Sequence, residues 1–257
     1  MPPVELDQQG HVLLITLNRP EALNALDYET YVALRECWND FRDDDNLHAA
    51  VVTGAGDKAF CAGSDIKDIA PRLNDGTLEK WMVDQPLLEG VELYKPVVAA
   101  VNGYALGAGF ELVMACDIAV ASDNAQFGLP EVTIGRLPGY GLARLPRAMP
   151  RKLALEMILT GGRITATEAH RRGLVNHVTS PADLLPKALE LAQAMASLSP
   201  LTLQAAKEVT IRGMELTQAG AQTLTDEVLK ARIYPSHDAA EGALAFKEKR
   251  APVWQGR

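Results

Sequence analysis

The chain has 257 residues, of which 47% are hydrophobic and 23% are charged. This composition excludes an intrinsically disordered or collagen-like protein and allows a substantial buried core. Thirty-three acidic side chains against 25 basic ones give a net charge of −8, so the average surface repels phosphate polymers and anionic membranes. We therefore expect neither a nucleic-acid partner nor a membrane partner.

The cysteines and the start of the chain indicate the compartment. The three cysteines are far apart, odd in number and free of any C-x-x-C pair, which argues against a disulfide framework and a thiolate metal site. The first residues show no basic segment followed by an apolar one, so we expect no secretory signal. The long apolar tract 96–121 is interrupted by polar residues and glycines, which favours buried core over a membrane span. A cytoplasmic protein without a metal is expected.

The first elements are a hairpin and a helix. Residues 4–6 and 11–17 are rich in β-forming residues and flank a turn that ends at Gly10. Asp27 can cap the helix that follows. The apolar stripe of this helix has spacings of three and four residues, and its members are Tyr31, Leu34, Trp38 and Phe41.

The middle of the chain predicts an α/β architecture. Residues 49–53 and 97–101 are short apolar runs, each followed by glycine and then by a helical pattern. Such alternation is typical of a largely parallel sheet covered on both faces. From Ser180 onward the pattern is mostly helical, with capping serines before helix starts. We therefore expect an α/β core over residues 1–180 and a helical C-terminal subdomain over 181–257.

Two glycine-rich turns between a strand and a helix suggest an anion site. They lie in the segments 60–69, FCAGSDIKDI, and 96–117, PVVAAVNGYALGAGFELVMACD. Small residues allow the backbone to approach a ligand closely, and a helix start leaves N–H groups without intrahelical partners. Two such turns on neighbouring parallel strands would direct two N–H groups at one oxygen, as an oxyanion hole does. The alternative for each turn alone is tight packing without function.

Two glutamates are the candidate acid and base. Glu111 lies among apolar residues, where a buried carboxylate is costly unless it is partnered or used. The alternative is that it interacts with the N-terminus of its own helix. Glu131 follows a proline in the segment 126–141, QFGLPEVTIGRLPGYG, where the alternative is a solvated turn.

At these segments the sequence resembles the enoyl-CoA hydratase/isomerase, or crotonase, family. The similarity also includes ITLNRPEALNAL near the N-terminus and AFKEKRAPVW near the C-terminus, so it covers nearly the whole chain. The resemblance implies a spiral of ββα units with a helical trimerisation region near the C-terminus. It also implies a coenzyme A thioester as the substrate, so that no separate cofactor is needed.

The resemblance further implies a site and a reaction. Water would add reversibly to an α,β-unsaturated acyl-CoA. Backbone N–H groups of Ala62 and Ala108 would hold the thioester oxygen, Glu111 would act as the base, and Glu131 would give a proton to the α carbon. Further residues expected to contact the substrate are Gly63, Ser64, Asp65, Ile66, Gly107 and Tyr140.

Assembly is also implied by the resemblance. Family members form trimers that often pair into hexamers. By this analogy, Phe246 and Lys249 would reach the nucleotide of coenzyme A in a neighbouring subunit, and Lys58 and Lys67 would flank the first glycine turn.

Three alternatives stay open at this point. An isomerase of the same family would use one carboxyl to move a double bond. The C-terminal sequence YPSHDAAEGALAFKEKRAPVWQGR resembles the branch that contains carnitinyl-CoA dehydratases, which raises a specialised dehydratase. Some family relatives associate with RNA, but the net charge disfavours that function here.

Overall fold

The largest element of the computed structural model is a six-stranded sheet with the order β1-β2-β3-β5-β7-β10. The structure describes residues 2–75, 88 and 91–257. β1 pairs antiparallel with β2, as expected for the hairpin, and the remaining pairs are parallel. The strands are β1 (Val4–Gln9), β2 (Val12–Leu17), β3 (Ala49–Gly54), β5 (Val97–Val101), β7 (Ile118–Ser122) and β10 (His177–Thr179).

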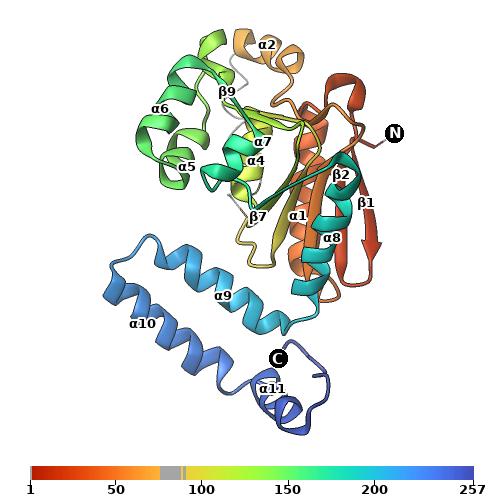
Figure 1. Cartoon of the computed structure of the whole chain (residues 1–257), viewed down its shortest axis with the longest axis vertical. Coiled ribbons are helices and arrows are strands. Elements are labelled where there is room, and N and C mark those ends of the chain that lie inside the picture. The colour runs from red at the N-terminus through yellow and green to blue at the C-terminus, as the bar shows by residue number, and fades with distance from the viewer. Residues whose placement is uncertain (1, 76–87, 89–90) are drawn as a thin grey trace.

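A second, four-stranded sheet has the order β4-β6-β8-β9 (Figure 1). Its strands are β4 (Ala59–Cys61), β6 (Tyr104–Leu106), β8 (Gln126–Gly128) and β9 (Arg163–Thr165). β4, β6 and β8 are parallel, and β9 is antiparallel to β8. Because β4 leads to helix α2 (Ile66–Asp75) and β6 leads to α4 (Ala108–Ala115), the two glycine turns emerge from neighbouring parallel strands.

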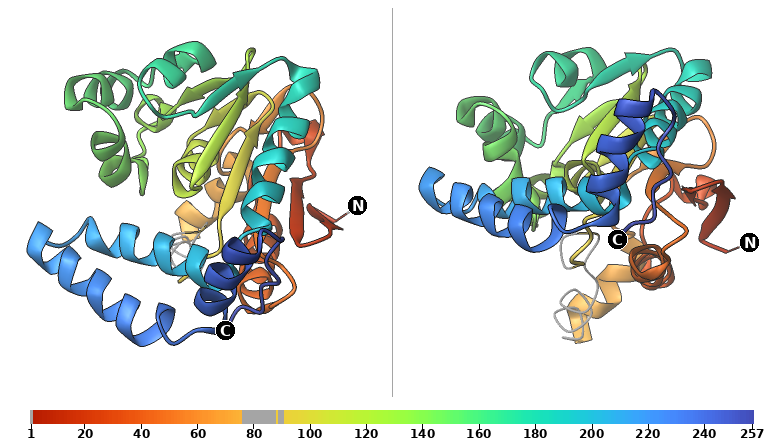
Figure 2. Two further views of the ribbon diagram at one scale, coloured as in Figure 1. Left: turned by 60° about the horizontal axis from the view of Figure 1, so that its bottom comes forward. Right: turned by 90° about the horizontal axis from the view of Figure 1, so that it is seen from below.

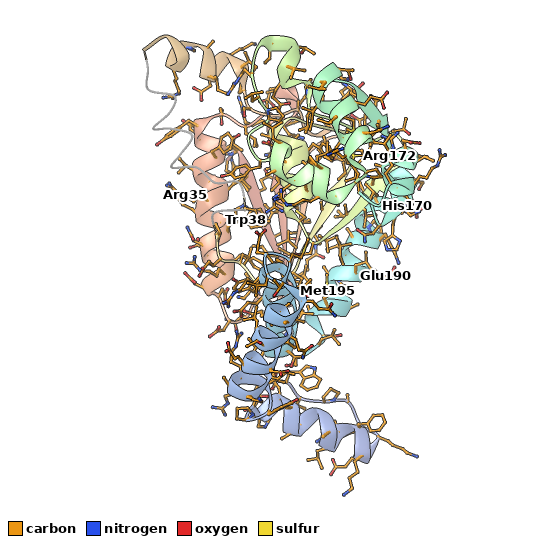
Figure 3. The ribbon with its side chains drawn as sticks, turned by 90° about the vertical axis from the view of Figure 1, so that its left-hand side faces the viewer. Arg35, Trp38, His170, Arg172, Glu190 and Met195 are labelled. Carbon is orange, nitrogen blue, oxygen red and sulfur yellow. The ribbon has the colours of Figure 1, made fainter. Side chains whose placement is uncertain are left out.

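Helix α1 (Tyr28–Asp43) confirms the predicted cap and apolar stripe. The Asp27 carboxylate accepts a hydrogen bond from the Thr30 N–H at 2.9 Å. All four stripe residues are buried, and Figure 3 shows Trp38 on the inner side of the helix. The stripe packs into the main hydrophobic core together with residues of β2, β3 and β5.

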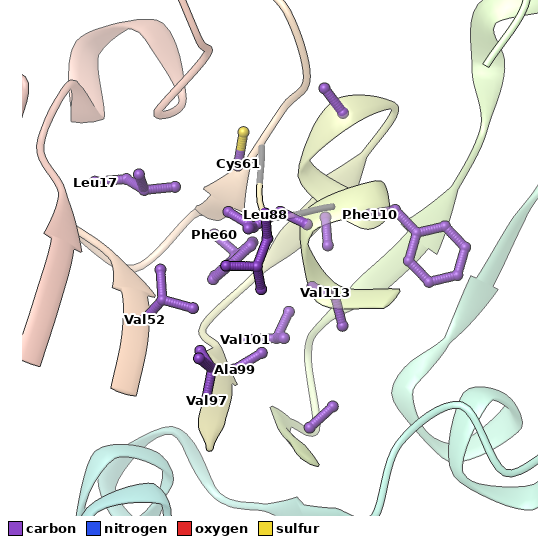
Figure 4. Packing of buried hydrophobic residues seen from close by; sticks show 14 of the residues in the cluster. Leu17, Val52, Phe60, Cys61, Leu88, Val97, Ala99, Val101, Phe110 and Val113 are labelled. Carbon is purple, nitrogen blue, oxygen red and sulfur yellow. The ribbon is translucent and has the colours of Figure 1, made fainter. Parts of the chain in front are cut away.

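Strand β5 divides the interior into two cores. Val97, Ala99 and Val101 face the main core, which lies between the sheets and includes Phe60 and Phe110 (Figure 4). The alternate residues of β5 face a second core, which α8 (Pro181–Ala196) covers through alanines four residues apart. The sheet is therefore covered on both faces, as its apolar strands predicted.

The rest of the chain is mostly helical. Ser180, Ser199 and Ser236 cap α8, α9 (Pro200–Gly213) and α11 (His237–Glu248), as the capping serines predicted. α9 and α10 (Gln218–Val228) lie side by side below the sheets in the view of Figure 1, with α11 near the C-terminus (Figures 1 and 2). The remaining elements are η1 (Pro20–Ala22), η2 (Pro130–Ile134), α5 (Gly141–Ala148), α6 (Arg151–Thr160), α7 (Ala166–Arg171) and the π-helical turn η3 (Leu229–Ile233).

The predicted division at residue 180 coincides with the end of the last strand. α8 nevertheless packs on the large sheet, so the segment that extends from the body begins at α9. The assignment of residues 181–257 to a separate helical subdomain stays a prediction. In the part of the chain that the structure describes, the helices are too short or too polar to cross a membrane.

Candidate active site

The two glycine turns lie against each other. Gly63 follows β4 with a φ of +102°, and Gly107 precedes α4 with a φ of +53°. A Cβ atom at Gly63 would lie 3.0 Å from the Leu106 carbonyl oxygen and 3.6 Å from the Ala108 nitrogen. Both positions thus require glycine, for their backbone angles and for the close approach of the two turns.

The backbone hydrogen bonds of the first turn correct the predicted donor. The Ala62 N–H already donates to the Leu23 carbonyl at 3.1 Å, so the assignment of this amide to an oxyanion hole is wrong. Leu26 pairs instead with both neighbours of Ser64: its N–H donates to Gly63 O, and its carbonyl accepts from Asp65 N, each at 2.8 Å. Because successive N–H groups of an extended segment point to opposite sides, the Ser64 N–H points away from Leu26.

The second turn presents the backbone amide of Ala108, and its role as an oxyanion donor stays a prediction. Ala108 is the first residue of α4, where a helix leaves its N–H groups without intrahelical partners. Among the described hydrogen bonds, none is donated by the backbone N–H of Ala108 or of Ser64. Ala108 does not have a positive φ, so alanine is compatible with this position.

A cavity of about 220 Å³ lies at these turns and brings most of the predicted residues together. Its wall includes both candidate amide donors and both glutamates. It is bounded on one side by the glycine turns and on the other by the segment that begins at Pro130. The lining residues are Tyr31, Ala62, Gly63, Ser64, Ile66, Gly107, Ala108, Glu111, Pro130, Glu131, Thr133, Ile134, Arg136, Leu137, Gly139 and Tyr140.

Glu111 lies in the first turn of α4 and is 6% exposed. Its Oε1 atom accepts a hydrogen bond from the Gly141 N–H at 2.7 Å. Gly141 is the first residue of α5, so the carboxylate binds the N-terminus of a different helix from its own. Glu111 therefore does more than interact with the N-terminus of its own helix.

Glu131 lies in η2 and is not a solvated turn residue. Its Oε2 atom is buried and makes no hydrogen bond. Burial raises the pKa of Glu131, while a hydrogen bond from its own backbone N–H and the charge of Arg136 oppose that shift. A Cβ atom at Gly107 would lie 2.8 Å from Oε1, so the carboxyl group lies directly against the second glycine turn.

Tyr31 and Arg136 are two of the cavity residues that were not predicted as site residues. Tyr31 was assigned to the core, but its hydroxyl lies 2.9 Å from the Ser64 Oγ atom at the cavity wall. Burial raises the pKa of Tyr31, so the phenol stays neutral and can hold the Ser64 turn by a hydrogen bond. Arg136 lies in the same sequence segment as Glu131 and Tyr140. This proximity was the signal by which the sequence could have identified Arg136 as a site residue.

Comparison with known proteins identifies the family. The model described as enoyl-CoA hydratase/isomerase matches residues 7–257. The chain belongs to the enoyl-CoA hydratase/isomerase family. It is 42% identical to (E)-benzylidenesuccinyl-CoA hydratase of Thauera aromatica over 99% of each chain. It is 43% identical to carnitinyl-CoA dehydratase of Proteus mirabilis, over 99% of this chain and 98% of that one.

Solved structures confirm the crotonase fold. The chain superposes on an enoyl-CoA hydratase from Bacillus anthracis with a TM-score of 0.93 and 36% identity, over 99% of this chain and 100% of that one. For an enoyl-CoA hydratase from Mycobacterium tuberculosis H37Rv the TM-score is 0.90 at 34% identity, over 100% of both chains. The predicted resemblance and α/β fold class are thereby confirmed.

Three of the predicted substrate contacts are absent from the cavity wall of the single chain. Asp65 is absent from the cavity wall: its carboxylate accepts hydrogen bonds from Arg19 at 3.1 Å and from the Lys67 N–H at 3.0 Å. Its side chain therefore holds the turn and the start of α2. Phe246 and Lys249 lie on and just after α11, away from α2 and α4 (Figure 1). Their predicted role concerns a neighbouring subunit and stays a prediction.

Proposed function

We propose that this protein is an enoyl-CoA hydratase that adds water reversibly to an α,β-unsaturated acyl-CoA thioester. The observation that carries the proposal is the single cavity that holds two available amides and two carboxyl groups. Relatives named as hydratase and dehydratase support it, because both reactions are the same addition of water run in opposite directions. Coenzyme A is part of the substrate, so the proposed reaction needs no further cofactor.

The N–H groups of Ser64 and Ala108 would bind the thioester oxygen. Negative charge develops on that oxygen when a hydroxyl group adds to the β carbon and the enolate-like state forms. A preorganised amide donor accelerates such a step by roughly a hundredfold to a thousandfold. These donors belong to the main chain, so their position depends on Gly63 and Gly107 rather than on side-chain identity.

The two carboxyl groups would supply the proton transfers. Glu111 removes a proton from water as the oxygen–carbon bond forms at the β carbon, and Glu131 donates its proton to the α carbon. Both groups return to their starting states by exchanging protons with each other or with solvent. The raised pKa of Glu131 supports its role as the donor, because it favours the protonated form.

Substitution of the two glutamates tests the reaction. Glu111→Gln and Glu131→Gln should each lower kcat for hydration of crotonyl-CoA by about a hundredfold or more. Glu36→Gln removes an equal charge from an exposed position of α1 and should leave kcat unchanged. Unchanged turnover in either cavity variant would reject the use of two carboxyl groups and would favour the one-acid chemistry of an isomerase.

We extend the proposal to a trimeric or hexameric assembly. The segment 200–246 carries large apolar side chains that the single chain leaves exposed, and Phe246 is 89% exposed. Sedimentation velocity should give a mass of three or six chains, whereas a monomer would contradict this part of the proposal. The exposed residues are Ile211, Met214, Leu216, Tyr234, Leu244 and Phe246.

A further inference from the structure

Arg136 places a positive charge in the wall of the cavity. It follows Gly135, which ends η2 in a left-handed conformation, and its backbone N–H donates to the Glu131 carbonyl at 2.9 Å. The residue is partly buried and lines the cavity together with Leu137 and Tyr140. Its backbone is thus fixed relative to the proposed proton donor.

The cavity has two chemically different sides. The glycine turns, with the N–H groups of Ser64 and Ala108, form the side where the thioester oxygen would bind. The segment 130–140 forms the rest of the wall, so an acyl group held by its carbonyl on the first side would extend toward Thr133, Arg136 and Tyr140. Arg136 therefore lies where the acyl group is recognised, beyond the thioester carbonyl.

Arg136 is the group in the described cavity wall that can attract an anionic acyl group. Among the described residues of this wall, Glu111 and Glu131 are the acids and Arg136 is the base. The charge of Arg136 also opposes, in small part, the rise that burial causes in the pKa values of Tyr31 and Glu131, as expected for a cation near both side chains. An arginine binds a carboxylate through two parallel N–H donors, whereas a neutral acyl chain offers it no acceptor of comparable strength.

We propose that Arg136 binds a carboxylate on the acyl group, so that the preferred substrates are short enoyl-CoA thioesters with an anionic acyl end. The inference rests on the proposed function for the identity of the thioester. A short acyl group follows from the volume of about 220 Å³, which is below the roughly 300–1,000 Å³ of typical ligand pockets. An acyl group with a cationic end is disfavoured by the same arginine.

Binding of saturated thioesters tests the inference without requiring turnover. By titration calorimetry, glutaryl-CoA should bind the wild type roughly tenfold or more tightly than its methyl ester, as expected for a hydrogen-bonded charge pair. Arg136→Gln should abolish this preference. Arg136→Lys should keep part of it, because lysine keeps the charge but loses the paired donors. Arg151→Gln, at an exposed position of α6, should keep all of it.

Turnover of a matched pair of substrates separates recognition from an indirect effect on Glu131. In Arg136→Gln, the ratio of kcat/KM for glutaconyl-CoA to kcat/KM for crotonyl-CoA should fall by about tenfold or more. An unchanged ratio would mean that Arg136 acts only through Glu131 and would overturn the inference. Arg136→Lys supplies the same comparison should the glutamine variant not fold.

The two experiments distinguish failure of the inference from failure of the proposed function. Equal affinities for glutaryl-CoA and its methyl ester, with hydration of both enoyl substrates intact, would overturn the role of Arg136 alone. A wild type that hydrates neither glutaconyl-CoA nor crotonyl-CoA would overturn the proposed function, and the affinities would still decide whether Arg136 binds a carboxylate.

Discussion

The Glu111 carboxylate and the Gly141 N–H are joined by a hydrogen bond of 2.7 Å, although 30 positions separate them in the sequence. The bond connects the first turn of α4 with the first residue of α5. It fixes the direction of the carboxylate within the cavity and also satisfies a buried amide. Glu111 therefore contributes to the fold as well as to the proposed chemistry.

Glu111→Ala should destabilise the protein, whereas Glu111→Gln should not. Alanine leaves the buried Gly141 N–H without its acceptor, which costs about 1–3 kcal/mol of unfolding free energy. The glutamine oxygen can still accept that hydrogen bond. Urea denaturation measures both variants, with Glu36→Ala as the control at an exposed position. An alanine variant as stable as the wild type would show that the bond to Gly141 contributes nothing to stability.

Glu131→Gln should change how stability depends on pH. The pKa of Glu131 is raised by burial above its ordinary value of 4.5, so the folded state holds this proton more tightly than the unfolded chain does. The stability that this group contributes is fully present below pH 4.5 and is lost as the pH rises through the folded pKa. Glutamine does not ionise, so the variant avoids this loss.

Denaturation curves across this pH range test the sign. The unfolding free energy of Glu131→Gln minus that of the wild type should increase as the pH rises from 4.5 through the folded pKa, and then level off. Glu36→Gln should show no such increase, because its side chain is exposed. A difference that decreases with pH would mean that the folded state stabilises the ionised carboxylate instead.

Gly107→Ala should abolish turnover by displacing Glu131. The new Cβ atom would lie 2.8 Å from the Glu131 Oε1 atom, and the φ of +53° is unfavourable for alanine. Gly10→Ala is the matched control, because it has a φ of +64° in the β1–β2 turn and nothing within 4 Å of the added atom. Both variants should lose some stability, but only Gly107→Ala should lose hydration activity. Equal activities would contradict the contact between residue 107 and the carboxyl group.

The sequence predicts those features that depend on residues near one another in the chain. The α1 stripe, the Asp27 cap and the apolar strand β5 follow from periodicity and local hydrogen bonding, and the structure confirms them. The two glycine turns also follow from local pattern, because Gly63 and Gly107 take backbone angles that other residues avoid. These features indicate the fold class and the region of the site.

Features that depend on pairing between distant segments could not be predicted. Whether the Ala62 or the Ser64 amide is available as a donor in the cavity depends on which residues form hydrogen bonds with Leu23 and Leu26. The periodicity of the sequence does not show this pairing. The same holds for the acceptor role of Glu111 toward Gly141. The side chain of Asp65 was assigned to the substrate because the sequence does not show that Arg19 lies beside it.

Replacing single amides by esters tests the corrected donor. An ester linkage at residue 64 removes the Ser64 N–H, while the Gly63 carbonyl remains as a weaker acceptor for Leu26, and it should lower kcat by roughly a hundredfold to a thousandfold. An ester at residue 62 removes the bond to the Leu23 carbonyl and should lower the unfolding free energy by about 1 kcal/mol, with a far smaller effect on kcat. The opposite ranking of the two kcat values would restore the Ala62 assignment.

The most direct measurement is the fate of solvent oxygen during turnover. The wild type, incubated with crotonyl-CoA and glutaconyl-CoA in water enriched in oxygen-18, should form 3-hydroxyacyl thioesters that carry the label at the β carbon, at a rate that depends on both Glu111 and Glu131. Conversion of a β,γ-enoyl-CoA, added as a third substrate, into its conjugated isomer, with no labelled hydroxyl group formed from any of the three thioesters, would contradict the proposed hydratase.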